Sequence, residues 1–229
     1  MIFDFNGTLV DDSVFHDMAW NSISIELRGK PFTVEELRTE IYGMNNSSIV
    51  NYLSGQASSA EILSGMAEKK ERIYRELCLA DPGKFKLVPG AEAFLDFLKV
   101  HDIPRAIATA SGPDNVDFYV ERLGLDRWFP SGKIVFDDST FRGKPAPDFY
   151  LIASGRLNLA PGECVVFEDS ASGLKSADNA GIGMIVAVKN GKEPGFKSHS
   201  LRIDLSIEDF TGIDAGGLFQ SGDIVKCRS

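Results

Sequence analysis

Four short groups of acidic, hydroxyl-bearing and basic residues follow apolar runs in this 229-residue chain. They are Asp4 to Thr8, Thr109 to Ser111, Gly143 to Pro145 and Glu168 to Ser170. An aspartate can attack phosphorus, carboxylates bind hard divalent cations, and hydroxyl and ammonium groups donate to phosphate oxygens. Each group alone is common in turns. Four in this order are hard to obtain by chance, and together they indicate phosphoryl transfer.

The apolar runs that precede these groups have the length and composition of buried strands. The predicted strands are Met1–Phe5, Ile103–Ala108, Lys133–Phe136, Cys164–Phe167 and Gly183–Val188. Helical stretches lie between most of them, at Ala91–His101, Pro113–Leu123, Asp148–Leu157 and Ser172–Ala180. This alternation predicts an α/β fold with a doubly wound parallel sheet. Ligands of such sheets bind beyond the carboxyl ends of the strands, where the four groups would meet.

The segment from about Ser13 to Leu87 interrupts the alternation, because its apolar residues have helical spacing and it contains no convincing strand. We therefore predict two domains, a catalytic α/β core of residues 1–12 and 88–229 and a small all-helical cap of residues 13–87. Residues 211–229 carry little pattern and receive no assignment.

Composition narrows the class of protein. The net charge of -9 opposes a broad cationic surface for nucleic acid. Cys78, Cys164 and Cys227 are odd in number and far apart, which favours neither a disulfide framework nor a zinc site. The chain enters an apolar strand at once, with no signal-like segment and no run long enough to span a membrane. We expect a soluble, monomeric, cytoplasmic protein whose partner is a small phosphorylated metabolite.

The four groups also resemble the signature motifs of a known enzyme family. Asp4-Phe5-Asn6-Gly7-Thr8-Leu9, Thr109, Lys144-Pro145 and Glu168-Asp169-Ser170 are similar to the four motifs of the haloacid-dehalogenase superfamily. The helical insert resembles the small cap of its β-phosphoglucomutase and small-sugar-phosphatase branch. The resemblance covers nearly the whole chain and implies a phosphotransferase that depends on Mg²⁺.

The resemblance implies a role for each acidic residue. Asp4 would attack phosphorus and carry a transient aspartyl-phosphate. Asp4, the backbone carbonyl of Asn6 and the carboxylate of Asp169 would hold Mg²⁺. Glu168 would lie beside the metal.

The same resemblance implies the groups that bind the substrate. Thr109 and nearby amides would donate to the transferring phosphoryl group, and Lys144 would bridge that group and the nucleophile. Predicted substrate-binding residues are Phe5, His16, Asn46, Lys70, Ala110 and Ser111. Two of these have a plainer interpretation: His16 as a polar residue of a helix surface, and Lys70 as part of a solvated, charged helix face.

Residue 6 departs from the family pattern. Phosphatases and mutases of this family have a second aspartate there, which protonates the leaving oxygen and deprotonates the incoming one. Asn6 has no proton to exchange at neutral pH, although its backbone carbonyl can still bind metal. General acid and base catalysis contributes about 10² to 10⁴ in rate, so we expect impaired or altered activity.

A second departure lies in the cap. Asn46, three residues after Gly43, stands where β-phosphoglucomutases place an arginine that grips a second phosphate. The favoured function is therefore hydrolysis of a small phosphate monoester, with sugar phosphates as candidates. A β-phosphoglucomutase-like isomerase and a catalytically silent protein that binds a phosphorylated ligand are the alternatives.

Overall fold

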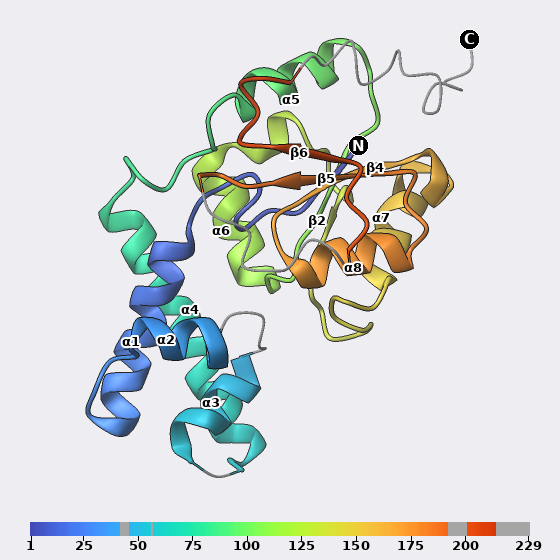
Figure 1. The fold of residues 1–229 in the computed structure, drawn as a ribbon. Coiled ribbons are helices and arrows are strands. Elements are labelled where there is room, and N and C mark those ends of the chain that lie inside the picture. The colour runs from blue at the N-terminus through green and yellow to red at the C-terminus, as the bar shows by residue number, and fades with distance from the viewer. Residues whose placement is uncertain (42–45, 56, 192–200, 214–229) are drawn as a thin grey trace. The chain divides into compact units, whose positions relative to one another are not determined.

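Strands of the α/β unit form one six-stranded parallel sheet (Figure 1). The structure, a computed structural model, describes residues 1–41, 46–55, 57–191 and 201–213. The strands are β1 (Ile2–Phe3), β2 (Ala106–Ala108), β3 (Ile134–Val135), β4 (Val165–Glu168), β5 (Met184–Val188) and β6 (Leu205–Ile207). This architecture confirms the predicted doubly wound sheet. The sequence analysis did not predict β6, whose three residues are too few to give a periodic pattern.

The order of the strands creates one switch point. It runs β3-β2-β1-β4-β5-β6, so the chain builds outward from β1 in one direction and then from β4 in the other. Ile2 pairs with Ala106 of β2 and with Val166 of β4. Loops that leave β1 and β4 diverge at this point, which is where open α/β sheets bind ligands.

Alternation along the strands gives the sheet two apolar faces. Ile2 and Val166 lie in a core cluster with residues of α7 (Asp148–Leu157) and α8 (Ala171–Asn179), which pack beside one another. Phe3 faces the other way, with its ring stacked 5.0 Å from Phe167 and an edge contact to Phe94 of α5 (Ala91–Val100). Helices therefore cover both faces, as expected from side chains that alternate across a strand.

The α/β unit also contains one more α-helix and two single 3-10 turns. They are α6 (Pro113–Leu123) and the 3-10 turns η2 (Leu125–Arg127) and η3 (Pro161–Glu163). The four predicted helices of this unit all form, with ends within one residue of their predicted bounds.

The chain divides into two compact units, Met1–Asp11 with Lys86–Ser229, and Asp12–Phe85. Elements of the second, helical unit are α1 (Ser13–Arg28), α2 (Val34–Glu36), the π-helical turn η1 (Leu37–Ile41), α3 (Asn46–Ser54) and α4 (Ala60–Ala80). Its own core is an apolar cluster that includes Trp20, Ile23, Ile41 and Ile49. No strand occurs in the described residues of this unit.

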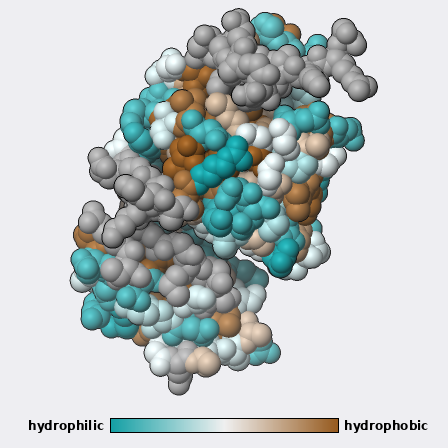
Figure 2. Space-filling view, turned by 45° about the vertical axis from the view of Figure 1, so that its right-hand side comes forward, coloured by the Kyte–Doolittle hydropathy of each residue, from teal (hydrophilic) through white to brown (hydrophobic). Residues whose placement is uncertain are grey.

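The surface is mixed in polarity. In the view of Figure 2, hydrophobic residues reach the surface in small groups among hydrophilic ones. None of the described helices combines the length and apolar composition of a membrane span. Cys78 and Cys164 are buried free thiols, and Cys227 lies outside the described residues.

Candidate active site

Asp4 follows β1 directly and extends its pairing with β4. Its backbone N–H donates to the carbonyl of Phe167 at 2.9 Å, which fixes the start of the loop that follows. Its carboxylate is buried and accepts a hydrogen bond from Lys144 Nζ, 2.6 Å from Oδ1. The predicted nucleophile therefore lies at the switch point of the sheet, in contact with the predicted lysine.

Lys144 bridges two carboxylates. Its Nζ lies 2.6 Å from Asp4 Oδ1 and 2.7 Å from Glu168 Oε1, although 140 and 24 residues separate these partners from it along the chain. Burial alone lowers the pKa of Lys144, but the charges of Asp4 and Glu168 outweigh this effect and raise it well above its usual value. The side chain therefore stays positively charged.

Three carboxylates share this edge of the sheet. Oxygens of Asp4, Glu168 and Asp169 lie within 4.8 Å of one another. Burial raises the pKa of Asp4 to about 7; Lys144 opposes the rise and Glu168 adds to it. Burial and the two neighbouring carboxylates also raise the pKa of Asp169 well above its usual value. One lysine leaves an excess of negative charge, so this donor set fits a hard cation with oxygen ligands such as Mg²⁺.

Glycines make room for two of these carboxylates. A Cβ at Gly7, which has φ +82°, would lie 2.1 Å from Asp169 Oδ2. A Cβ at Gly173, near the start of α8, would lie 1.5 Å from Glu168 Oε1. A side chain at Gly7 would displace Asp169, a predicted metal ligand, and a side chain at Gly173 would displace Glu168.

Glu168 has several donors besides Lys144. Tyr150 OH lies 3.2 Å from its Oε1, and the backbone N–H and hydroxyl of Ser170 lie 2.7 and 3.1 Å from its Oε2. The carboxylate is 1% exposed. These hydrogen bonds compensate for its loss of water and hold it in one orientation.

The loop after Asp4 is held from two sides. Thr8 Oγ1 donates to Asp169 Oδ1 at 3.1 Å. Asn190, which follows β5 with φ +48°, reaches back with its amide to the carbonyls of Gly7 and Thr8, at 2.5 and 3.4 Å. This brings the ends of β1, β4 and β5 together around the carboxylates.

Asn6 faces the hydroxyl groups that follow β2. Its Oδ1 accepts from Ser111 Oγ at 2.8 Å and from Thr109 Oγ1 at 3.3 Å. Its Nδ2 donates to Tyr119 OH at 3.0 Å, and Tyr119 OH lies 3.2 Å from Ser111 Oγ. The predicted phosphate donors and the unexpected asparagine therefore belong to one network. The neighbouring Ala110 is exposed.

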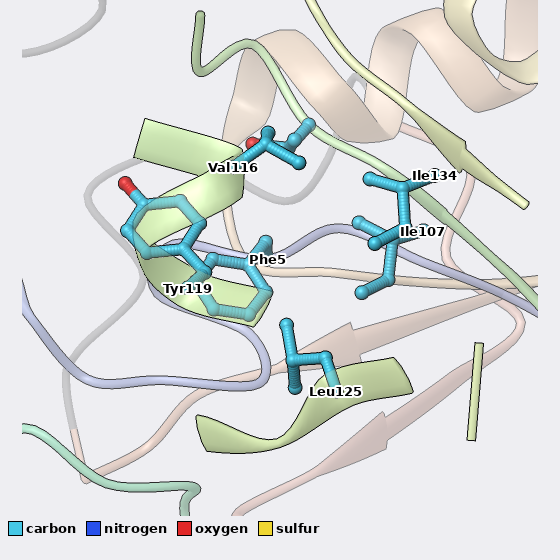
Figure 3. Close-up of a pocket in the computed structure, with 7 residues that line it drawn as sticks. Phe5, Ile107, Val116, Tyr119, Leu125 and Ile134 are labelled. Atoms are coloured by element: carbon cyan, nitrogen blue, oxygen red, sulfur yellow. The ribbon is translucent and has the colours of Figure 1, made fainter. Parts of the chain in front are cut away.

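Phe5 takes part in packing through its side chain. It is fully buried, and its ring stacks on Tyr119 with centroids 4.3 Å apart. The Tyr119 hydroxyl points away from the apolar side chains around it (Figure 3). These side chains leave no room between them for a water molecule; they are Phe5, Ile107, Val116, Leu125 and Ile134. A substrate contact of Phe5 would therefore use its backbone.

Lys70 and His16 lie together in the helical unit. Lys70 Nζ is 2.7 Å from His16 Nδ1 and 2.9 Å from Glu71 Oε1, and the lysine is 2% exposed. The solvated-face interpretation is therefore wrong for Lys70, although it holds for Arg72, whose side chain is 64% exposed. Burial of a lysine depends on which helices pack over it, and a local run of charges does not report this.

Further polar residues complete this cluster. His16 also lies 3.5 Å from the buried carboxylate of Asp12, which accepts a hydrogen bond from Tyr74. Asn46 donates to Glu71 at 3.0 Å. Gly43, which defined the comparison with the mutase arginine, lies outside the described residues. The part of His16, Asn46 and Lys70 in substrate binding stays a prediction.

Sequence reasoning missed three side chains that hold the site residues in place. They are Tyr119, Tyr150 and Asn190. Two are inside helices that had been predicted for their apolar spacing, so their hydroxyl groups gave no separate signal. Asn190 gave a weak signal, because asparagine adopts the left-handed backbone more readily than most residues and this one stands two residues after a predicted strand.

Comparisons with known proteins agree with this geometry. Residues 1–181 match the family described as haloacid dehalogenase-like hydrolase. A phosphorylated carbohydrates phosphatase from Thermotoga maritima is 33% identical over 199 residues, which cover 85% of this chain and 87% of that protein. A probable pseudouridine-5'-phosphatase from Drosophila melanogaster is 28% identical over 217 residues, 91% of this chain and 90% of that protein. The crystal structure of a HAD hydrolase, family IA, variant 3, from Entamoeba histolytica has a TM-score of 0.86 at 34% identity and covers 93% of both chains.

The chain belongs to the haloacid dehalogenase-like hydrolase family. This confirms the family predicted from the four motifs. The predicted enzyme class, a phosphatase, is the class named for both relatives.

Proposed function

We propose that this chain is a Mg²⁺-dependent phosphatase that hydrolyses small phosphate monoesters, sugar phosphates among them, with Asp4 as nucleophile. The observation that carries the proposal is the contact of Lys144 Nζ with Asp4 Oδ1 at 2.6 Å, beside two more carboxylates. A lysine there offsets the charge of the nucleophile and of the phosphoryl group it attacks. The name of the Thermotoga relative, a phosphorylated carbohydrates phosphatase, supports the substrate class.

Hydrolysis would take two substitutions at phosphorus. A carboxylate oxygen of Asp4 forms a bond to phosphorus while the bond to the ester oxygen breaks, and the ester oxygen leaves as an anion that takes a proton from water. Water then attacks phosphorus while the bond between phosphorus and the Asp4 oxygen breaks, the water's proton passes to solvent, and inorganic phosphate leaves with Asp4 regenerated. Bound Mg²⁺ would neutralise charge on the phosphoryl group. Asp4, the carbonyl of Asn6 and Asp169 would hold it, with Glu168 beside it.

Asn6 sets the preference among substrates. Its amide can donate a hydrogen bond but cannot transfer a proton to a leaving alkoxide. An aryl phosphate leaves as a stabilised anion and hardly needs that proton, whereas a sugar alkoxide does. We therefore expect faster turnover of aryl phosphates than of sugar phosphates. The helical unit keeps its predicted role as a cap that supplies His16, Asn46 and Lys70 to the substrate.

Turnover of an aryl phosphate tests the nucleophile. The unmodified protein with MgCl₂ should release inorganic phosphate from p-nitrophenyl phosphate, and Asp4→Ala should release none above background. Asp126→Ala, at an exposed aspartate of η2, is the matched control and should keep full activity. Substantial turnover by Asp4→Ala would refute the assignment. Binding of phosphate without turnover in the unmodified protein would favour the silent binding protein.

Asn6→Asp tests the acid and base role. It should raise turnover of a sugar phosphate by roughly 10² or more and that of the aryl phosphate much less. Because Asn6-Gly7 is prone to deamidation, intact-mass and peptide analysis must confirm residue 6 in each sample. Unchanged sugar-phosphate turnover would show that the proton comes from another group or is not limiting. Conversion of glucose 1-phosphate to glucose 6-phosphate without phosphate release would favour the isomerase.

A further inference from the structure

Asn6, Ser111 and Tyr119 form a closed ring of hydrogen bonds. Asn6 Nδ2 donates to Tyr119 OH at 3.0 Å, the tyrosine hydroxyl can donate to Ser111 Oγ at 3.2 Å, and Ser111 Oγ donates to Asn6 Oδ1 at 2.8 Å. Each group gives one hydrogen and accepts one. An ionised carboxylate at residue 6 has no hydrogen to give, so the ring in this direction requires an amide.

Thr109 adds a fourth hydrogen bond, which also places a hydroxyl hydrogen on the amide oxygen of Asn6. Its hydroxyl accepts from the backbone N–H of Ser111 at 3.1 Å, which leaves its hydrogen to donate to Asn6 Oδ1 at 3.3 Å. The amide oxygen of Asn6 therefore receives the hydroxyl hydrogens of both Thr109 and Ser111. Thr109 is the predicted donor to the transferring phosphoryl group and Ser111 is a predicted substrate-binding residue, so we expect phosphate to bind beside these two hydroxyls.

We propose that Tyr119 is a positioning residue that holds the Asn6 amide on the hydroxyls of Thr109 and Ser111, so that the amide oxygen competes with phosphate for these donors. The inference rests on the proposed function only for the place of the phosphoryl group. Phosphate oxygens are charged and accept stronger hydrogen bonds than an amide oxygen, so phosphate displaces Asn6. It does so at a reduced affinity, because the ring has to open first.

Tyr119 suits this role by its packing. It is 1% exposed, and its ring stacks on Phe5, so the position of its hydroxyl is fixed by the core of the α/β unit. Asn6 is partly exposed, and its side chain can turn toward solvent when phosphate takes its place. Loss of the tyrosine hydroxyl removes two of the three hydrogen bonds in the ring and leaves the stacked ring in place.

Titration with inorganic phosphate in a calorimeter, at one fixed MgCl₂ concentration, tests the competition. Tyr119→Phe should bind phosphate about 3- to 10-fold more tightly than the unmodified protein, because one hydrogen bond that phosphate must break, from Asn6 Nδ2 to Tyr119 OH, is already absent. A merely structural tyrosine would give the opposite sign, because a loosened site binds more weakly. Unchanged or weaker phosphate binding would overturn the inference, as would no binding by any of the proteins.

Two further variants test whether Tyr119 affects phosphate binding through Asn6. Asn6→Ala should also tighten phosphate binding, and Tyr119→Phe in the Asn6→Ala background should add nothing. A further gain in the double variant would overturn the inference. If Tyr119→Phe does not fold, Asn6→Ala alone decides, and no tightening there would overturn it. Tyr150→Phe is the matched control: it removes an equally buried hydroxyl that contacts Glu168, and it should not tighten binding.

Turnover is measured separately from phosphate binding, so failure of the proposed function can be distinguished from failure of the proposed competition. A protein that shows the expected phosphate affinities but hydrolyses no ester would overturn the proposed function alone. A protein that hydrolyses esters but binds phosphate no better after Tyr119→Phe would overturn only the competition.

Discussion

Lys144 of the α/β unit and Lys70 of the helical unit are both buried lysines, with 8% and 3% of their side chains exposed. Their partners differ. Lys144 contacts two buried carboxylates, Asp4 and Glu168, within 2.7 Å. Its charge compensates the concentration of negative charge formed by Asp4, Glu168 and Asp169. Removal of this lysine leaves carboxylates facing one another without a counterion.

Lys70 has a much less acidic environment. Its nitrogen contacts His16 Nδ1 and the carboxylate of Glu71, which is 23% exposed. The faces of Trp20 and Tyr74 lie 5.5 and 5.4 Å from it. Aromatic rings and a partly hydrated carboxylate attract a cation, but they are not strongly destabilised when the cation is removed. The comparison teaches that two equally buried lysines can differ in how much the rest of their unit requires their charge.

Lys144→Met should have the largest effect on activity of the variants that test this comparison. It should lower kcat for p-nitrophenyl phosphate by roughly 10² to 10³, the usual cost of losing a group that stabilises developing charge. Lys70→Met, the same change at an equally buried lysine, should keep that kcat within about threefold. Steady-state assays of both variants with MgCl₂ check this. Similar losses in the two variants would show that the lysines do not differ in the proposed way.

Asp4→Asn tests the crowding of carboxylates through stability and pH. The pKa of Asp4 is raised from its ordinary 3.8 to about 7, chiefly by burial. The contribution of Asp4 to the stability of the folded protein is therefore lost as the pH rises from about 4 through 7, because the carboxylate must ionise in an unfavourable place. Without Mg²⁺, the variant should be more stable than the unmodified protein by about 4 kcal/mol at pH 8, because each unit of the pKa shift corresponds to about 1.4 kcal/mol, and the difference should vanish near pH 4.

Thermal unfolding at both pH values checks this result, with an expected rise in Tm of roughly 8 to 16 °C at pH 8. Added MgCl₂ should reduce the gain, because a bound cation removes the repulsion in the unmodified protein alone. Asp126→Asn, at an exposed position, is the control and should show no such dependence on pH. An equal gain at pH 4 and pH 8 would contradict the electrostatic explanation.

Lys70→Met sharpens the helical side of the comparison. If Lys70 binds the part of the substrate that is not transferred, kcat/KM for a sugar phosphate should fall by about 10-fold, the value of one charged hydrogen bond. Turnover of the aryl phosphate should hardly change. Lys69→Met removes a partly exposed neighbour that contacts Glu26 and should leave the turnover of both substrates unchanged. Equal losses for the two substrates would indicate a structural role for Lys70.

Most strand ends could be predicted because buried parallel strands appear in the sequence as continuous apolar runs. The first predicted strand extended two residues too far, to Phe5, which is a buried apolar residue in the loop after β1. Asp4, Thr109 and Glu168 each lie within one residue of an observed strand end. Strand starts were less certain: Ile103 was predicted to begin the strand that starts at Ala106. Apolar composition extends into the residues before the strand, whereas hydrogen bonding to the neighbouring strands begins later.

The partners of these residues could not be predicted in the same way. Tyr119 is 113 residues from Asn6, and Lys70 is 54 residues from His16. Such pairs depend on how helices pack, which periodicity does not determine. Asn6 was recognised as a departure from the family pattern, but only the structure shows that its amide donates a hydrogen bond to Tyr119.

Tyr150→Phe carries the smallest expected effect and asks how firmly Glu168 is held. Tyr150 OH donates to Glu168 Oε1 at 3.2 Å, but Lys144 and the two donors of Ser170 contact the same carboxylate at 3.1 Å or less. The variant should therefore lose only about 1 kcal/mol in stability and less than about fivefold in turnover. Burial and the charge of Glu168 raise the pKa of Tyr150 well above its usual value, so its hydroxyl stays a donor at every assay pH and the loss should not vary between about pH 6 and 9. A fall in turnover as large as that expected for Lys144→Met would mean that the tyrosine and not the lysine sets the position of Glu168, and the contrast between the two buried lysines would then need another origin.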